Sequence, residues 1–122
     1  MVEYLDLEDL LTLTQDLRAG PVRDPGLLEA AVARPRTSVF GDDAYPSLFE
    51  KAAALLHSIC QNHALVDGNK RLAWLAADVF LRINDTVIEM TDEDAFALVM
   101  RVAADHVEVA DIAAVLESAP RS

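Results

Sequence analysis

One short segment of the chain brings together several residue types that carry out chemistry. It spans residues 63–71, reads HALVDGNKR, and contains a histidine, a carboxylate, a glycine and two adjacent cations. Imidazole suits proton transfer near neutral pH, and cations beside a glycine at a helix start suit the binding of phosphate. The segment is therefore a candidate site for a phosphorylated ligand.

Lys70 and Arg71 stand at the start of a helix expected over residues 69–84. The helix dipole disfavours cations in that first turn by roughly 0.3–1 kcal/mol each. In one interpretation, Gly68 lets the backbone approach a phosphate closely, free N–H groups of the first turn face it, and the two cations add charge-assisted hydrogen bonds. In the other, the segment is a Gly-Asn turn with solvated basic side chains.

Asp67 and His63 each admit a structural and a chemical interpretation. An aspartate before a helix is commonly its N-cap, but a carboxylate beside bound phosphates is also a ligand that Mg²⁺ prefers. A histidine just beyond the end of a helix is stabilised by the helix dipole, but imidazole also acts as a general base on a nucleophilic hydroxyl. The residues alone leave both pairs of alternatives open.

The charge of the whole chain excludes several classes of partner. Lys and Arg number 10 against 21 Asp and Glu, which gives a formal net charge of −11 at pH 7. General binding to nucleic acid or to anionic membranes needs a basic surface, so we expect neither. No apolar run approaches the roughly 18 residues that span a bilayer. The single cysteine, Cys60, excludes an intramolecular disulfide and fits a cytoplasmic protein, in which we expect it to be buried.

The remaining sequence predicts a single all-α domain over residues 1–122. Helix caps, prolines and the spacing of apolar residues predict about six helices. They are expected over residues 7–19, 24–34, 46–61, 69–84, from 91 onward, and 109–118. Residues 36–45 break the helical period and predict a short hairpin or ordered loop. Trp74, Phe80 and Ile83 in the fourth helix, and Phe96 in the fifth, are expected to face the core.

The segment 63–71 resembles the active-site motif of the Fic/Doc (Fido) superfamily, and most closely that of the death-on-curing (Doc) toxins of bacterial toxin–antitoxin modules. Fic members carry HxFx(D/E)GNGRxxR, and Doc members carry HxFx(D/N)(A/G)NKR. Lys70 replaces the second glycine of the Fic form and Trp74 its second arginine, and both differences favour Doc. Leu65 departs from both forms, which place a phenylalanine there as the apolar anchor of the loop. The DPG sequence at residues 24–26 and LRIN at 81–84 extend the resemblance over most of the chain.

The resemblance implies a compact all-α Fido fold of about six helices, with a short flap before the helix pair that carries the motif. It also implies a toxin that acts in the bacterial cytoplasm as an ATP-dependent protein kinase. Such a kinase transfers the γ-phosphate of ATP to a threonine of elongation factor Tu and so arrests translation. The implied roles are a base for His63, a Mg²⁺ ligand for Asp67, phosphate binding for Lys70 and Arg71, and shaping of the cradle for Gly68 and Asn69.

Two kinds of protein partner follow from the same resemblance. The flap residues Ser38, Val39, Phe40 and Gly41 would pair with an extended segment of the target as an added strand. The chain contains no inhibitory string of the form (S/T)xxxE(G/N), so inhibition is expected from a separate, Phd-like antitoxin. The surplus of acidic residues would complement a basic antitoxin.

Two other functions remain open at this point. One is the Fic-type transfer of AMP from ATP to a protein hydroxyl. The other is a weakly catalytic module that binds an antitoxin and represses its own operon, and Leu65 in place of the motif phenylalanine is the residue that favours it.

Overall fold

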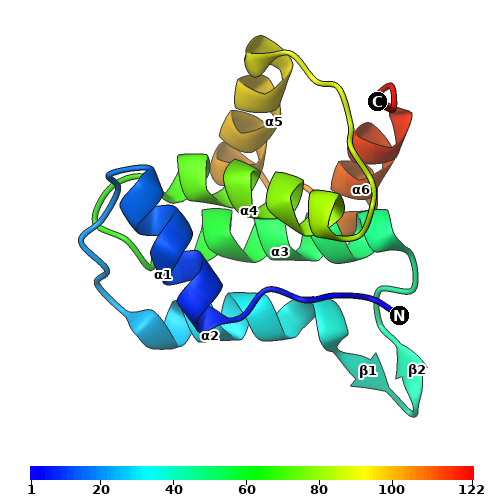
Figure 1. The fold of residues 1–122 in the computed structure, drawn as a ribbon, viewed down its shortest axis with the longest axis horizontal. Coiled ribbons are helices and arrows are strands. Elements are labelled where there is room, and N and C mark those ends of the chain that lie inside the picture. The colour runs from blue at the N-terminus through cyan, green and yellow to red at the C-terminus, as the bar shows by residue number, and fades with distance from the viewer.

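A computed structural model describes residues 1–122. At its centre, α3 (Leu48–Asn62) and α4 (Asn69–Ile83) lie side by side, joined by the loop 63–68 (Figure 1). Around this pair, Figure 1 shows α1 (Leu7–Asp16) and α2 (Pro25–Ala33) toward one side and α5 (Asp92–Ala104) and α6 (Val109–Ser118) toward the other. The predicted all-α class with six helices is confirmed. None of these helices is both long enough and apolar enough to cross a membrane.

Most helices begin where the sequence provides a cap. Asp6 forms a capping box with Asp9 at the start of α1, and the side chains of Ser47 and Thr91 accept hydrogen bonds from backbone N–H groups of α3 and α5. Asp24 caps α2, in which Pro25 occupies the first position. Since a capping side chain satisfies an N–H group that has no partner within the helix, these starts are fixed locally.

The apolar core lies between α3, α4 and the helices around them. Phe80, Leu55 and Leu56 are at most 1% exposed, and Leu65 from the 63–68 loop is 2% exposed. Cys60 is buried as predicted, and burial raises the pKa of its thiol to about 11, against the opposing effect of the Lys70 charge. The thiol is therefore protonated and unreactive near neutral pH.

Two predicted core residues face solvent instead. Phe96 is 63% exposed and Ile83 is 41% exposed. The apolar stripe of α5 is complete without Phe96, because its buried residues follow the helical spacing i, i+3, i+4, i+7. They are Ala95, Leu98, Val99 and Val102. In α4 the buried face is formed by Ala76, Ala77, Phe80 and Leu81 together with Leu72 and Ala73, and this face leaves Ile83 exposed.

The first helix ends earlier than its predicted boundary. It stops at Asp16, with Leu17 as C-cap, whereas the sequence predicts a helix to residue 19. Arg18 adopts a positive φ of 54° and Gly20 one of 105°, so the chain turns sharply. The turn is stabilised by a distant partner, because the N–H of Gly20 donates to the carbonyl of Asp67 at 2.8 Å. Tertiary hydrogen bonding overrides the local helical pattern here.

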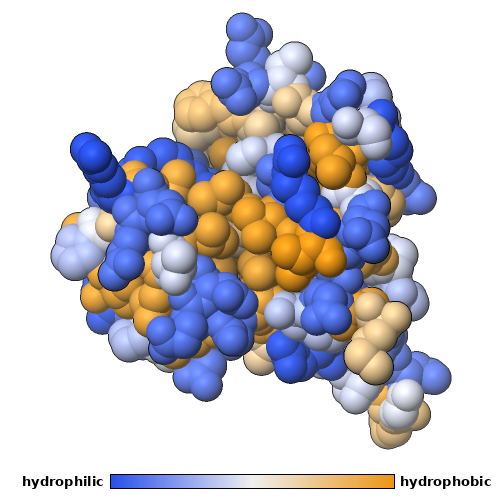
Figure 2. All heavy atoms as spheres, in the orientation of Figure 1, coloured by the Kyte–Doolittle hydropathy of each residue, from blue (hydrophilic) through white to orange (hydrophobic).

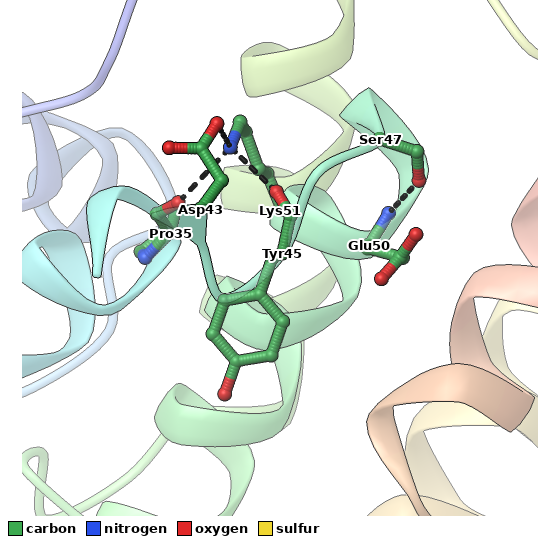
Figure 3. Close-up of polar contacts among 6 residues, drawn as sticks. All are labelled: Pro35, Asp43, Tyr45, Ser47, Glu50 and Lys51. Atoms are coloured by element: carbon green, nitrogen blue, oxygen red, sulfur yellow. Dashed lines mark hydrogen bonds and ion pairs between the residues drawn. The ribbon is translucent and has the colours of Figure 1, made fainter. Parts of the chain in front are cut away.

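The predicted hairpin is present and is fixed to α3 by a buried lysine. Strands β1 (Ser38–Val39) and β2 (Asp42–Asp43) pair antiparallel, after a short 3-10 turn at Arg34–Arg36. Lys51 is 2% exposed, and its Nζ donates to Asp43 Oδ2 at 3.1 Å and to the Tyr45 carbonyl at 2.5 Å (Figure 3). Because the Lys51 charge is paired and hydrogen-bonded, the free-energy cost of burying it is offset.

Candidate active site

Residues 63–68 form a tight loop between α3 and α4. His63 is the C-cap of α3 and adopts left-handed backbone angles, φ 51° and ψ 46°. Gly68, the N-cap of α4, has a φ of 96°, which favours glycine. Two left-handed residues thus reverse the chain, so that α4 runs back along α3 and the motif residues gather at one end of the pair (Figure 1).

Leu65 and Asn69 hold the interior of the loop together. The N–H of Leu65 donates to Asn69 Oδ1 at 3.0 Å, and Asn69 Nδ2 donates to the carbonyl of Leu65 at 2.9 Å. The side chain of Leu65 is almost wholly buried, so it fills the anchor position predicted for it. The oxygen and the nitrogen of the Asn69 amide both bond to the backbone of Leu65, so Asn69 shapes the loop from within.

A second segment, residues 17–24, supports the loop from behind; we call it the supporting segment. In addition to the Gly20–Asp67 bond, the N–H of Val66 donates to the carbonyl of Pro21 at 3.0 Å. The N–H groups of Arg23 and Asp24 both donate to the carbonyl of Ala64, at 2.7 and 3.1 Å. The sequence contains no signal for this pairing, since the two segments are about 45 residues apart and the bonds are made by backbone atoms.

Two arginines connect side chains to the same assembly. The guanidinium of Arg23 donates through Nη2 to the carbonyl of His63. Arg71 Nη1 donates to the carbonyl of Leu17 at 3.2 Å, and its Nη2 lies 3.6 Å from Asp67 Oδ2. Arg23 is a residue that sequence reasoning missed, because only the folded chain brings it to His63.

Asp67 does not cap α4. The N-cap is Gly68, and no side chain accepts a hydrogen bond at this helix end. The Asp67 side chain is 84% exposed, and its ion pair with Arg71, at 3.6 Å, is longer than the Lys51–Asp43 and Arg82–Asp78 pairs. The capping interpretation is therefore wrong, and the carboxylate is accessible to a ligand. No group of three or more His, Cys, Asp or Glu side chains is arranged as a metal site. A single carboxylate nevertheless fits Mg²⁺, which is commonly held by one or two carboxylates together with substrate phosphates and water.

The uncapped start of α4 opens into a cleft of about 370 Å³ between α4 and α5. The lining from the loop and α4 is Asp67, Gly68, Asn69, Lys70, Arg71 and Trp74, and that from α5 is Asp92, Ala95, Phe96 and Val99. Lys70 and Arg71 are exposed, and unpartnered N–H groups with adjacent cations favour an anion. Trp74, predicted to face the core, is partly buried: it packs against the core and also lines the cleft.

The structure separates the predicted site residues into two groups. His63 belongs to the same 63–71 segment as Asp67, Gly68, Asn69, Lys70 and Arg71, although it does not line the cleft itself. The hairpin with Ser38, Val39, Phe40 and Gly41 lies at the other end of α3 (Figure 1). That helix has 15 residues, a length of about 22 Å. The role of the hairpin in target binding stays a prediction.

The fold and the loop define the class of protein. The chain matches the model of the Fic/DOC family over residues 4–81, which include the whole 63–71 segment, and it belongs to this family. It is similar to a protein named Toxin Doc from Mycolicibacterium smegmatis, with 63% identity over 86 residues. The match covers 69% of this chain and 66% of that relative, so the chain spans just under two thirds of the relative's length. The predicted resemblance to the Doc branch is confirmed.

Proposed function

We propose that this protein is the toxin of a bacterial toxin–antitoxin module and acts in the cytoplasm as an ATP-dependent protein kinase. One observation carries the proposal. A chain of net charge −11 exposes Lys70 and Arg71 at an uncapped helix start, in the same 63–71 segment as His63. Folding alone favours acidic residues at that place, so the two cations are better explained by an anionic substrate. The similarity to Toxin Doc supports the toxin role.

The residues of the loop divide the work of phosphoryl transfer. Lys70, Arg71 and the free N–H groups at the start of α4 would bind the phosphates of ATP. Asp67, which is exposed beside them, would hold Mg²⁺, and this ion supplies charge neutralisation on the phosphate oxygens when it is bound. Gly68 and Asn69 keep the backbone close to the phosphates.

His63 would act as the general base. As the hydroxyl oxygen of a target threonine forms a bond to the γ-phosphorus, imidazole accepts the hydroxyl proton. The bond between the γ-phosphorus and the oxygen that bridges it to the β-phosphate breaks, and ADP leaves. Arg23 supports this role because its hydrogen bond to the carbonyl of His63 restrains the backbone that carries the base.

Two substitutions in the motif favour transfer of the γ-phosphate over transfer of AMP. Lys70 occupies the place of the second glycine in the AMP-transferring Fic form, and Trp74 that of its second arginine. A lysine there fills part of the anion site, and a tryptophan removes a phosphate ligand. Both changes favour ATP bound in the direction opposite to that in the Fic form. The γ-phosphate, and not the α-phosphate, would then lie at the reacting position.

The proposed protein partners are elongation factor Tu, which would be modified on a threonine, and a Phd-like antitoxin. For the target, the hairpin offers an exposed strand pair with a wholly exposed Phe40. For the antitoxin, α4 carries an incompletely covered apolar stripe at i, i+4 and i+8, formed by Leu75, Val79 and Ile83. Figure 2 shows hydrophobic side chains gathered across the middle of the face that α4 crosses, between hydrophilic margins. The surplus negative charge would add attraction to a basic partner, weakened by salt.

The test uses purified protein, elongation factor Tu and ATP labelled in either the γ- or the α-phosphate. The kinase proposal expects γ-label on a threonine of the factor and no α-label. Label from the α-phosphate would replace the proposal by AMP transfer. If neither label is transferred while an antitoxin still binds, the protein is the weakly catalytic binding module.

A further inference from the structure

Half of the cleft has no role in binding phosphates. Apart from Asp92, its lining beyond the first turn of α4 is apolar and aromatic, with Trp74 on α4 and Ala95, Phe96 and Val99 on α5. Phe96 is the informative member, because it is 63% exposed on a helix whose buried stripe is complete without it. Exposure of a large aromatic side chain loses the free energy that its burial would gain, so packing does not explain its place.

We propose that Trp74 and Phe96, with Val99 behind them, form the binding site of the nucleobase. This inference rests on the proposed function, since it takes the ligand to be a nucleoside triphosphate. Such a ligand is charged at one end and flat and apolar at the other. The cleft has the same division, with cations and free N–H groups at the start of α4 and aromatic side chains one turn further on. Bases stack on aromatic side chains, and this stacking tolerates any base.

The two helices present matched walls to such a ligand. Lys70 and Trp74 are four residues apart on α4, and Asp92 and Phe96 are four residues apart on α5. Residues at this spacing share one face of a helix. Each wall therefore has a charged group and an aromatic group, and the base would lie between the aromatic groups.

Asp92 fixes the direction of the ligand. Its carboxylate lines the cleft from the start of α5 and makes no ion pair with the chain. A carboxylate repels phosphate and accepts hydrogen bonds from hydroxyl groups, so Asp92 suits the ribose. The phosphates are thereby confined to Lys70 and Arg71. The volume of about 370 Å³ lies within the range of small-molecule pockets, at its lower end.

Trp74 makes the proposal measurable, because it is the single tryptophan of the chain. Its fluorescence is titrated with ATP and, separately, with inorganic tripolyphosphate, which has the charged end and no base. We expect ATP to change the emission of Trp74. We expect tripolyphosphate to compete with ATP while leaving the emission nearly unchanged. Equal changes with both ligands would overturn the assignment of Trp74.

Variants then separate the two ends of the cleft, with dissociation constants measured by calorimetry. Phe96→Ala removes an exposed side chain, and we expect it to weaken ATP binding about tenfold and to leave tripolyphosphate binding unchanged. Lys70→Ala should weaken the binding of both ligands. Met100→Ala is the matched control, since Met100 lies one turn further along α5, is 41% exposed and does not line the cleft.

The outcomes distinguish this inference from the function on which it rests. If ATP binds in a Lys70-dependent way and Phe96→Ala leaves its affinity unchanged, the nucleobase assignment fails and the phosphate site stands. If Phe96→Ala weakens ATP and tripolyphosphate equally, its effect is structural and the assignment also fails. If neither ligand binds the unmodified protein, the proposed function and the inference fail together.

Discussion

Ala19 packs against Gly68 so closely that no side chain fits at Gly68. A Cβ atom there would lie 2.4 Å from the Cβ of Ala19 and 3.0 Å from Nη2 of Arg71. The backbone of Gly68 is also left-handed, with a φ of 96°. Glycine is therefore required at position 68 for two reasons: the left-handed backbone, and the close contact with Ala19 of the supporting segment.

Gly68→Ala tests this double requirement. The left-handed conformation should cost about 1–2 kcal/mol in an alanine, and the contact with Ala19 about 1–3 kcal/mol more. Chemical denaturation measures the free energy of unfolding, and ATP binding should be lost in parallel. Gly41→Ala is the matched control, because Gly41 has a φ of 84° and no atom within 4 Å of the added Cβ. Equal losses at the two glycines would show that the contact with Ala19 has no energetic weight.

Leu65 yields a prediction about the departure from the family motif. Its side chain is 2% exposed, so Leu65→Ala should leave a cavity and lower the free energy of unfolding by about 2–5 kcal/mol. Leu65→Phe restores the residue of the motif, but the site is already packed around leucine. We expect overpacking to cost about 1–3 kcal/mol and activity not to rise. A Leu65→Phe variant that is both more stable and more active would show that the leucine loosens the loop.

His63→Ala separates catalysis from folding. The side chain is exposed, so stability and ATP affinity should change little. Loss of a general base should lower the rate of transfer to the target about 10²–10⁴-fold. His106→Ala is the control, since His106 is also exposed and lies outside the cleft. If a His63→Ala variant arrests growth as strongly as the parent, His63 is not the general base, and the protein is the weakly catalytic module that binds an antitoxin.

The candidate site divides into a part that the sequence predicts and a part that it does not. The 63–71 segment is contiguous, and its cations contradict the local preference of a helix start, so sequence alone identifies it. Four hydrogen bonds between the supporting segment and the loop join backbone atoms, which leave no trace in side-chain types, and the Arg23 side chain reaches His63 only in the folded chain. The sequence pattern predicts a buried Phe96, because a pattern in one sequence does not distinguish an apolar residue that packs in the core from one that lines a cleft. Asp67 looks like a cap by position, but in the folded chain its exposed side chain makes no capping hydrogen bond.

Arg34 and His57 make the base of the hairpin sensitive to pH. Arg34 lies between the hairpin and α3, where its Nη1 is 2.8 Å from Nδ1 of His57 and its Nε donates to the Tyr45 hydroxyl at 2.9 Å. Because arginine is always a donor, His57 Nδ1 must accept, which requires a neutral imidazole. Burial, followed by the charge of Arg34, lowers the pKa of His57, and Glu108 opposes this in part.

A lowered pKa in the folded state means that the unfolded chain binds the proton more tightly. The stabilisation from neutral His57 is therefore complete above the ordinary histidine pKa of about 6.5 and is lost as the pH falls below it. We expect the free energy of unfolding to decrease between pH 7.5 and pH 5.5, and to decrease less in His57→Gln, whose amide oxygen can accept without titrating. Denaturant unfolding of both proteins at the two pH values measures the difference, with His106→Gln as the exposed control. An identical pH dependence in His57→Gln and the parent would show that the Arg34–His57 contact does not contribute to stability.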